Sequence, residues 1–305
     1  MSDDPQKRLL DAVTASGYKA GSLAAQLTPG PVAQAAASFL GVGLSQGMRS
    51  RRSMIERHLQ RVNPSLEGFA LRRAVQGAFD SYARYWVESF KVPTLSKRAV
   101  ERAFTTEGYT EHVLGALEHG KGVVVALPHL GGWEWAGRWL ADQGHRVSVV
   151  VEPLDNKELF DWFVELRSKL GMHVIPLGPE AGPTVIRALK ANEIVCLLSD
   201  RDIQRTGVEV EFFGERTTLP AGPATVALRT GAALVPTATY FTDRYNGHHA
   251  VVRPPIPTQR RGRLRDDVTR ITQHLARELE LLIGRAPEQW HLFQPNWPSD
   301  PGYYD

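Results

Sequence analysis

Cysteine is nearly absent from the sequence. Cys196 is the only cysteine among 305 residues, so no disulfide can form within the chain. A cytoplasmic protein is therefore expected, and Cys196, within "EIVCLLS", is interpreted as a small core residue. An uninterrupted apolar run of about 18 residues is also missing, which argues against a membrane-spanning helix. The first ten residues, MSDDPQKRLL, lack the basic and then apolar pattern of a signal peptide, so none is expected.

A strong excess of charge of either sign is lacking as well. The chain has 36 basic and 33 acidic residues, for a formal net charge of +3 and a pI near 9.0. This excess is too small to indicate a nucleic acid partner. Arginine supplies 28 of the 36 basic residues, and its planar guanidinium suits anionic headgroups and phosphates.

Helical patterns fill the first hundred residues. Apolar side chains recur every three or four positions over residues 9–27, "TPGP" then interrupts the pattern, and two further helices are predicted over residues 32–48 and 67–90. A basic helix is expected between these two. Its arginines are Arg49, Arg51, Arg52, Arg57 and Arg61. Residues 1–100 are therefore predicted to form a helical subregion. Packing against a sheet is the ordinary role of such helices, and contact with an anionic membrane surface is the functional alternative.

Short β-branched runs alternate with helical segments after residue 120. The runs are "GVVVALP", "RVSVVVE", "MHVIPL", "EIVCLLS", "VEVEFFG", "ALVPTATYF" and "HAVVRPP". Apolar strands that alternate with helices are typical of a mostly parallel sheet covered on both faces. The predicted fold class is thus α/β, with one domain over residues 1–305 and an α/β core over residues 120–300.

The stretch "ALPHLGGWEW" at residues 126–135 follows the first of these runs. Pro128 ends the strand and leaves His129 at its carboxyl end, where ligands bind in open α/β sheets. Two glycines follow, and Glu134 falls in the first turn of the next helix. One interpretation is an ordinary capped turn. The other is a general base, His129, whose ring is oriented by the Glu134 carboxylate.

Ordered sequence blocks decide between these interpretations. Besides "HLGGWE", they are "RYWVESF", "SDRD", "FFGERTTLPAGPA", "TGAALVP" and "PEQWHLFQPNW". In this order, over roughly residues 50–297, they resemble the acyltransferase superfamily whose hallmark is His-x4-Asp/Glu. Within it, the chain is similar to the lipid A acyltransferase branch and to its actinobacterial relatives, the phosphatidylinositol mannoside acyltransferases.

The resemblance implies transfer of a fatty acyl group, such as palmitoyl, from acyl-coenzyme A to a sugar hydroxyl of a membrane glycolipid. In the mannoside branch the acceptor is the 6-hydroxyl of a mannose on phosphatidylinositol, and a lipid A-type acceptor is the alternative. The family needs no metal or bound cofactor and acts at the cytoplasmic face of the cell membrane. His129 would be the base and Glu134 its partner.

The resemblance also implies an acceptor site at Glu152 and Arg167. Asp200 aligns where relatives often carry Glu. Carboxylates and arginine commonly hold sugars through hydrogen bonds, which suits these residues and Arg201. Gly222 and Pro223 stand where the next helix begins, and free N–H groups at such a start can receive an anion.

Two other classes of function remain open from the residues. "GLSQG" at residues 43–47 matches the elbow motif of serine hydrolases, which would make Ser45 a nucleophile, although that motif needs a preceding strand. A non-catalytic lipid-binding protein is the other alternative. His248 and His249 are adjacent in a predicted strand, so they should point to opposite faces as ordinary strand residues.

Overall fold

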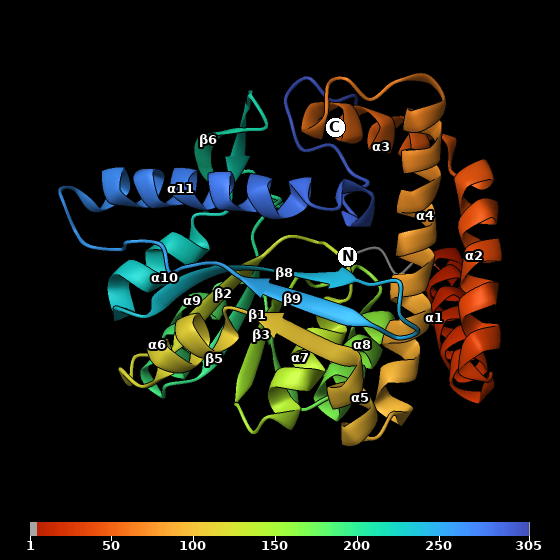
Figure 1. Ribbon diagram of the computed structural model, residues 1–305, viewed down its shortest axis with the longest axis horizontal. Helices are drawn as coiled ribbons and strands as arrows, with labels where there is room; N and C mark the ends of the chain where they lie inside the picture. Colours follow the sequence, from red (N-terminus) through yellow and green to blue (C-terminus); the bar gives the residue numbers. More distant parts are fainter. Residues whose placement is uncertain (1–4, 305) are drawn as a thin grey trace.

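The computed structural model describes residues 5–304. Residues 1–4 and 305, which the predicted domain over residues 1–305 includes, lie outside the described residues. Its main sheet has seven strands in the order β1-β9-β8-β2-β5-β3-β4 (Figure 1). Five neighbouring strands are parallel, whereas β9 runs antiparallel to β8. The strands are β1 (Phe104–Glu107), β2 (Val123–Leu127), β3 (Val147–Val151), β4 (Met172–Pro176), β5 (Ile194–Leu198), β8 (Ala233–Phe241) and β9 (His248–Val252). The α/β fold class predicted from the sequence is confirmed.

Helices cover both faces of this sheet. In Figure 1, α11 (Leu264–Gly284) lies above the sheet, while α5 (Lys97–Ala103), α7 (Trp133–Asp142) and α8 (Lys157–Lys169) lie below it. The helices α9 (Ala181–Lys190) and α10 (Gly222–Thr230) pack on the side of α11. Strand side chains alternate between the two faces. On β2, Val124 and Ala126 therefore join the core under α11, whereas Val123 and Val125 face the other way.

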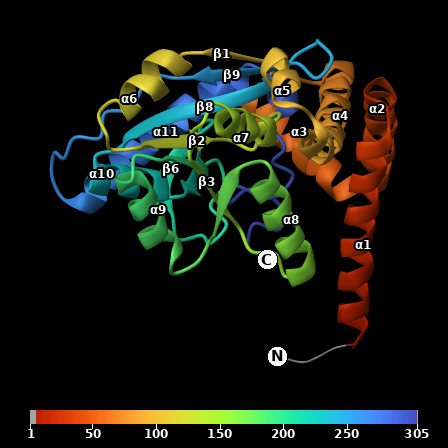
Figure 2. The ribbon, with the colours of Figure 1, turned by 90° about the horizontal axis from the view of Figure 1, so that it is seen from below.

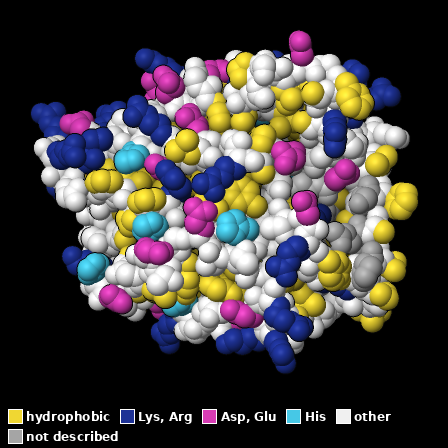
Figure 3. Space-filling view, in the orientation of Figure 1, with side chains coloured by type: hydrophobic (Ala, Val, Ile, Leu, Met, Phe, Trp, Pro, Cys, Tyr) yellow, Lys and Arg dark blue, Asp and Glu magenta, His cyan; other side chains and the backbone are white. Residues whose placement is uncertain are grey.

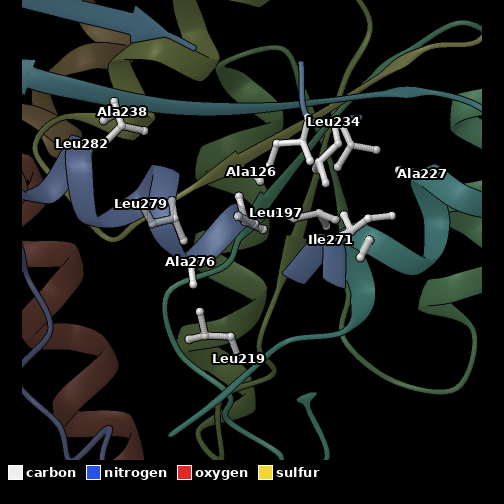
Figure 4. Close-up of a cluster of buried hydrophobic side chains, with 14 of the residues drawn as sticks. Ala126, Leu197, Leu219, Ala227, Leu234, Ala238, Ile271, Ala276, Leu279 and Leu282 are labelled. Carbon is white, nitrogen blue, oxygen red and sulfur yellow. The ribbon is translucent and has the colours of Figure 1, made fainter. Parts of the chain in front are cut away.

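The core beneath α11 is the largest of the apolar clusters. Figure 4 shows Ile271, Leu279 and Leu282 of this helix directed at side chains of the sheet, such as Leu234. Buried apolar area of this kind is the main stabilising contribution in folding.

The helical subregion at the start of the chain consists of α1 (Pro5–Leu27), α2 (Gly30–Gly47), α3 (Arg49–Val62) and α4 (Gly68–Lys91). Helix α4 packs against α1, α2 and α3, and Figure 2 shows α1 and α2 on the outer side of α4. Small residues allow the close approach. A Cβ atom on Gly41 of α2, for example, would collide with Asp80 of α4.

Two segments differ from the sequence prediction. "VEVEFFG" becomes β6 (Val208–Phe212), which does not join the main sheet but pairs with β7 (Glu215–Leu219) in an antiparallel hairpin. Its alternating burial, with Val210 and Phe212 inside, is that of a half-covered hairpin. In addition, residues 104–117 form β1, a π-helical turn at Tyr109–Leu114 and the short α6 (Gly115–Leu117), which the sequence did not reveal.

Among the described residues, no helix is both long and apolar enough to cross a membrane.

Replacing Ile271 with alanine should test the core beneath α11. Ile271 is fully buried, and truncation of such a side chain removes apolar contacts and leaves a cavity. We expect the free energy of unfolding to fall by roughly 2–5 kcal/mol, measured by urea denaturation. The matched control is Leu281→Ala on the same helix, where the side chain is 56% exposed and the loss should stay below about 0.5 kcal/mol. Equal losses in the two variants would contradict the described packing.

Candidate active site

His129 stands two residues beyond the end of β2. Its main-chain N–H donates to the Asp200 carboxylate at 3.0 Å, and its carbonyl accepts from the N–H of His291 at 2.6 Å. Gly131, two residues after His129, has φ +60°, and a side chain there would collide with the carbonyl of Thr239. The turn therefore requires glycine at this position. Main-chain hydrogen bonds and the close approach at Gly131 therefore fix the backbone of the loop that carries His129.

Asp200, not Glu134, is the partner of the His129 ring. The Nδ1–H of His129 donates to Asp200 Oδ1 at 2.7 Å. Asp200 follows β5, the neighbour of β2, so the carboxyl ends of two adjacent parallel strands bring the pair together. The expected pairing of His129 with Glu134 is therefore wrong. Helix α7 begins at Trp133 and directs Glu134 away, toward α8.

Asp200 is an ionised carboxylate that is buried away from solvent. Its side chain has no exposed surface. Burial raises the pKa of this carboxyl, but the charge and hydrogen bonds of His129 and the indole N–H of Trp290 outweigh burial, and the pKa lies below its ordinary value. A carboxylate bound to Nδ1–H fixes the tautomer of the ring and leaves Nε2 free to accept a proton. His129 itself keeps a quarter of its side chain exposed.

Glu134 takes part in a second buried pair. Arg167 of α8 donates to it through Nη2 at 2.5 Å and through Nε at 3.0 Å, and the Tyr85 hydroxyl of α4 donates to it at 3.3 Å. Burial, followed by the charge of Glu134, raises the pKa of Tyr85 well above its ordinary value. Glu134 thus joins α7 to α8 and α4, and Arg167 is occupied by Glu134.

A cavity of about 570 Å³ opens beside His129. This volume is typical of small-molecule sites. Its inner part lies between α7 and the sheet and is apolar, and the wall includes Val125, Val149, Cys196, Ala136 and Leu140. From Trp133 to Leu140, α7 rises about 10 Å along this wall. Burial raises the pKa of the Cys196 thiol to about 12, so this cysteine is an apolar wall residue.

Polar side chains gather around the other part of the cavity. Glu152, Arg167 and Arg201 line it, as do Gly222 and Pro223 at the start of α10. The structure therefore brings the catalytic and substrate-binding residues proposed for acyl transfer to one place: His129 and Glu134 also line the cavity, and Asp200 is bonded to His129. A smaller polar hollow of about 210 Å³ adjoins it through Arg201 and Asp202.

Sequence reasoning assigned no role to Tyr85, Trp290 or His291, three of the aromatic residues around His129. Trp290 donates its indole N–H to Asp200 at 2.7 Å. His291 is buried beside it and shares a hydrogen bond of 2.9 Å with Ser81, and burial lowers its pKa to about 3. Tyr85 stacks on Trp133, with ring centroids 4.1 Å apart. The available signal was the block "PEQWHLFQPNW", to which the residues alone assigned no role.

Three other residues singled out from the sequence, Ser45, His248 and His249, have surroundings that show their roles. Ser45 lies in the middle of α2, is buried and accepts a hydrogen bond from Arg52 at 2.6 Å, so it has no elbow geometry. His248 is buried 2.9 Å from Glu88, whereas His249 on the opposite face lies near Glu107, as expected for neighbours on a strand. Within residues 5–304, no three His, Cys, Asp or Glu side chains cluster as they would around a metal ion.

The fold and the site define an α/β protein with a histidine–carboxylate pair beside a cavity whose wall is largely apolar. The bacterial lipid A biosynthesis acyltransferase family matches residues 2–299, and the chain belongs to this family. It is similar to a phosphatidylinositol mannoside acyltransferase of Mycolicibacterium smegmatis, with 37% identity over 94% of this chain and 92% of that protein. The protein of that name from Mycobacterium tuberculosis (strain CDC 1551 / Oshkosh) is 40% identical over 73% and 70% of the two chains. A lipid A biosynthesis acyltransferase of Haemophilus influenzae is 23% identical over 82% and 77%.

Replacing Gly131 with alanine should damage the site. The new side chain meets both a positive φ and the carbonyl of Thr239, so the loop that carries His129 must move. We expect turnover to fall by on the order of 10²-fold, as misplacement by about 1 Å can do. Gly144→Ala is the matched control, because Gly144 has φ +93° but open space around its Cβ position. If both variants lose the same activity, the collision with Thr239 is not what matters.

Proposed function

We propose that the protein transfers a fatty acyl group, palmitoyl in the simplest case, from acyl-coenzyme A to the 6-hydroxyl of a mannose on a phosphatidylinositol mannoside. The His129–Asp200 pair beside an apolar cavity, in a chain of this family, carries the proposal. The choice of acceptor is supported by the relatives that are 37–40% identical, which are phosphatidylinositol mannoside acyltransferases. A lipid A-type acceptor is the alternative, supported by the weaker similarity to the Haemophilus protein.

The cavity suits an acyl chain followed by a reacting thioester. An apolar chain fits between α7 and the sheet, where Leu140 and Val113 contribute to the wall. The thioester carbonyl would then lie near His129, and the polar part of the cavity, with Glu152 and Arg201, would hold the sugar. Coenzyme A serves here as a carrier of the acyl group and not as a bound cofactor.

The chemistry needs one base and one path for the proton. Nε2 of His129 removes the proton of the mannose hydroxyl while that oxygen attacks the thioester carbon. The tetrahedral intermediate then collapses, the carbon–sulfur bond breaks, and the proton passes from His129 to the departing sulfur. The products are the ester and coenzyme A thiol. Asp200 stabilises the imidazolium that forms in between, because it is ionised and accepts the Nδ1–H.

Glu134 has a different part in this scheme. Its charge is met by Arg167, so it holds α7, and with it the turn after His129, against α8. The histidine and acid of the sequence motif therefore act as a base and a structural anchor, and the orienting carboxylate comes from residue 200.

Thiol release from palmitoyl-coenzyme A, with and without phosphatidylinositol mannoside, tests the proposal. His129→Ala should lower acceptor-dependent release by about 10²–10⁴-fold, because the base is lost. Asp200→Asn should lose on the order of 10²-fold or more, whereas Glu134→Gln should lose less activity and unfold more readily. Ser45→Ala, buried in α2, is the control and should keep full activity.

Other outcomes would redirect the proposal. Full release by His129→Ala, or loss confined to Ser45→Ala, would refute it. Silence of the wild type with every acceptor would favour a protein that only binds lipid. Release that depends on a lipid A precursor alone would replace the mannoside as acceptor.

We also propose that α1 and α2 place the protein on the cytoplasmic face of the cell membrane as a peripheral protein. Large apolar side chains are exposed along both helices, at Leu10, Val13, Leu23, Leu27, Val32, Phe39, Leu40 and Val42. Figure 3 shows hydrophobic side chains gathered along this edge of the molecule. Helix α2 carries no charged residue at all. An exposed apolar patch of this kind marks an interaction surface, and α1 adjoins α8, whose Phe160 and Phe163 line the cavity.

Two arginines of α3, the basic helix expected to attract anionic lipid, are bound to other groups of the protein. Arg61 is bound to Glu215 and Asp300, and Arg57 reaches Ser299 and Asp300, so these two tie α3 to the end of the chain. Arg49 is exposed, as are Arg72 and Arg73 on α4. Attraction to anionic lipid is therefore assigned to these three.

Co-sedimentation with phosphatidylinositol-containing vesicles tests the membrane proposal. The double variant Leu27→Ser, Phe39→Ser should bind at least about tenfold more weakly, since two apolar side chains of roughly 1.5–3 kcal/mol each no longer enter the lipid. Leu281→Ser on α11, also an exposed leucine but remote from α1, is the control. Neutralising Arg49, Arg72 and Arg73 should reduce binding to anionic vesicles. Binding that ignores all these changes and the lipid charge would overturn the proposal.

A further inference from the structure

The Asp200 carboxylate receives three hydrogen bonds from two residues. His129 supplies two of them, from its ring to Oδ1 and from its main chain to Oδ2. The third comes from Nε1 of Trp290, which donates to Oδ2 at 2.7 Å. Trp290 is thus a direct contact of the carboxylate that orients the base, although 90 residues separate the two in the sequence.

Trp290 is fixed relative to the same loop that carries His129. The N–H of Gly131 donates to the carbonyl of Gln289 at 3.0 Å, and the N–H of His291 donates to the carbonyl of His129 at 2.6 Å. Between these bonds, Leu130 and Trp290 form an antiparallel bridge. The indole is 3% exposed, so water does not compete for the Asp200 oxygen.

The plane of the carboxylate depends on the donors to Oδ2, which are the indole of Trp290 and the main-chain N–H of His129. The terminal torsion of an aspartate is broad and roughly two-fold, so the side chain does not fix its own plane. The ring of His129 needs one oxygen in line with Nδ1–H. An indole N–H stays protonated and points in one direction, and at Oδ2 it opposes rotation of the carboxylate away from His129.

We propose that Trp290 is a positioning residue for acyl transfer, whose indole N–H holds the Asp200 carboxylate in the orientation that aligns His129. This inference rests on the proposed function, in which His129 is the base. Trp290 touches neither substrate in this scheme and acts only through Asp200.

Trp297 provides a matched comparison. It is fully buried like Trp290, and its Nε1–H donates to a main-chain carbonyl, that of Phe212, at 3.0 Å. The two rings lie in one aromatic cluster, with centroids 6.3 Å apart. Phenylalanine at either position removes a buried indole N–H and similar volume. Only the change at Trp290 removes a bond to Asp200.

The experiment compares Trp290→Phe with Trp297→Phe in the thiol-release assay. Trp290→Phe should lower kcat by at least about tenfold, as expected for loss of a hydrogen bond to a charged group, with KM for palmitoyl-coenzyme A within about twofold of the wild type. Trp297→Phe should change kcat by less than about threefold, although both lower the thermal unfolding temperature. Equal effects on kcat would show that Trp290 only packs.

A double-mutant cycle separates positioning from packing. In an Asp200→Asn background the carboxylate that Trp290 would orient is absent, so adding Trp290→Phe should cost less than about twofold more, whereas Trp297→Phe should have its usual effect. Full additivity of Trp290→Phe with Asp200→Asn would overturn the inference. If Trp290→Phe does not fold, benzothienylalanine at position 290, and at 297 as control, keeps the ring shape and removes only the N–H.

Failure of this inference differs from failure of the proposed function. If His129→Ala is fully active, the base assignment falls, and with it the role given to Trp290. If His129→Ala is inactive but Trp290→Phe behaves as Trp297→Phe does, only the positioning role falls.

Discussion

The site depends on the need to stabilise one buried charge, the carboxylate of Asp200, which has no exposed surface. A buried charge is costly unless hydrogen bonds and a partner compensate it. Asp200 obtains this compensation from His129 and Trp290, which come from the end of a neighbouring strand and from the end of the chain. Segments far apart in the sequence must therefore come together at the two carboxylate oxygens of Asp200. This requirement explains why the backbone of residues 289–291 follows the loop at residues 129–131.

The two buried acids of the site, Asp200 and Glu134, have different partners and therefore different roles. Glu134 is buried as well, and Arg167 and Tyr85 satisfy it. A carboxylate neutralised in this way by a bidentate guanidinium contributes mainly to the position of α7 against α8. The donors to Asp200 are instead His129 and Trp290, so its charge acts on the imidazole. The acid nearest in sequence to the histidine is the anchor, and the distant one is the electrostatic partner.

The helical subregion at the start of the chain contributes to both sides of the structure. The inner face of α4 supplies Tyr85 to Glu134 and Trp86 to the cavity wall, while the outer faces of α1 and α2 leave apolar side chains exposed. If lipid covers that outer face, the aromatic contacts of Tyr18 with Trp86 and Phe163 form a short link between the membrane and the cavity. Their T-shaped geometry is ordinary for core aromatics.

Much of this protein was readable from local pattern. Apolar periodicity predicted the helices and the parallel strands, and Pro128 with the two glycines predicted His129 at a strand end, because backbone preferences act over a few residues. The sequence also placed Asp200 just beyond the predicted strand "EIVCLLS". It could not say which carboxylate His129 contacts, since the answer depends on strand order and on the direction in which α7 leaves the sheet. It gave no sign that Trp290 returns to Asp200, that "VEVEFFG" leaves the main sheet, or that Arg61 points inward. Local chemistry determined the candidates, and only the tertiary structure decided their partners, because hydrogen bonds between distant segments form in space and not along the chain.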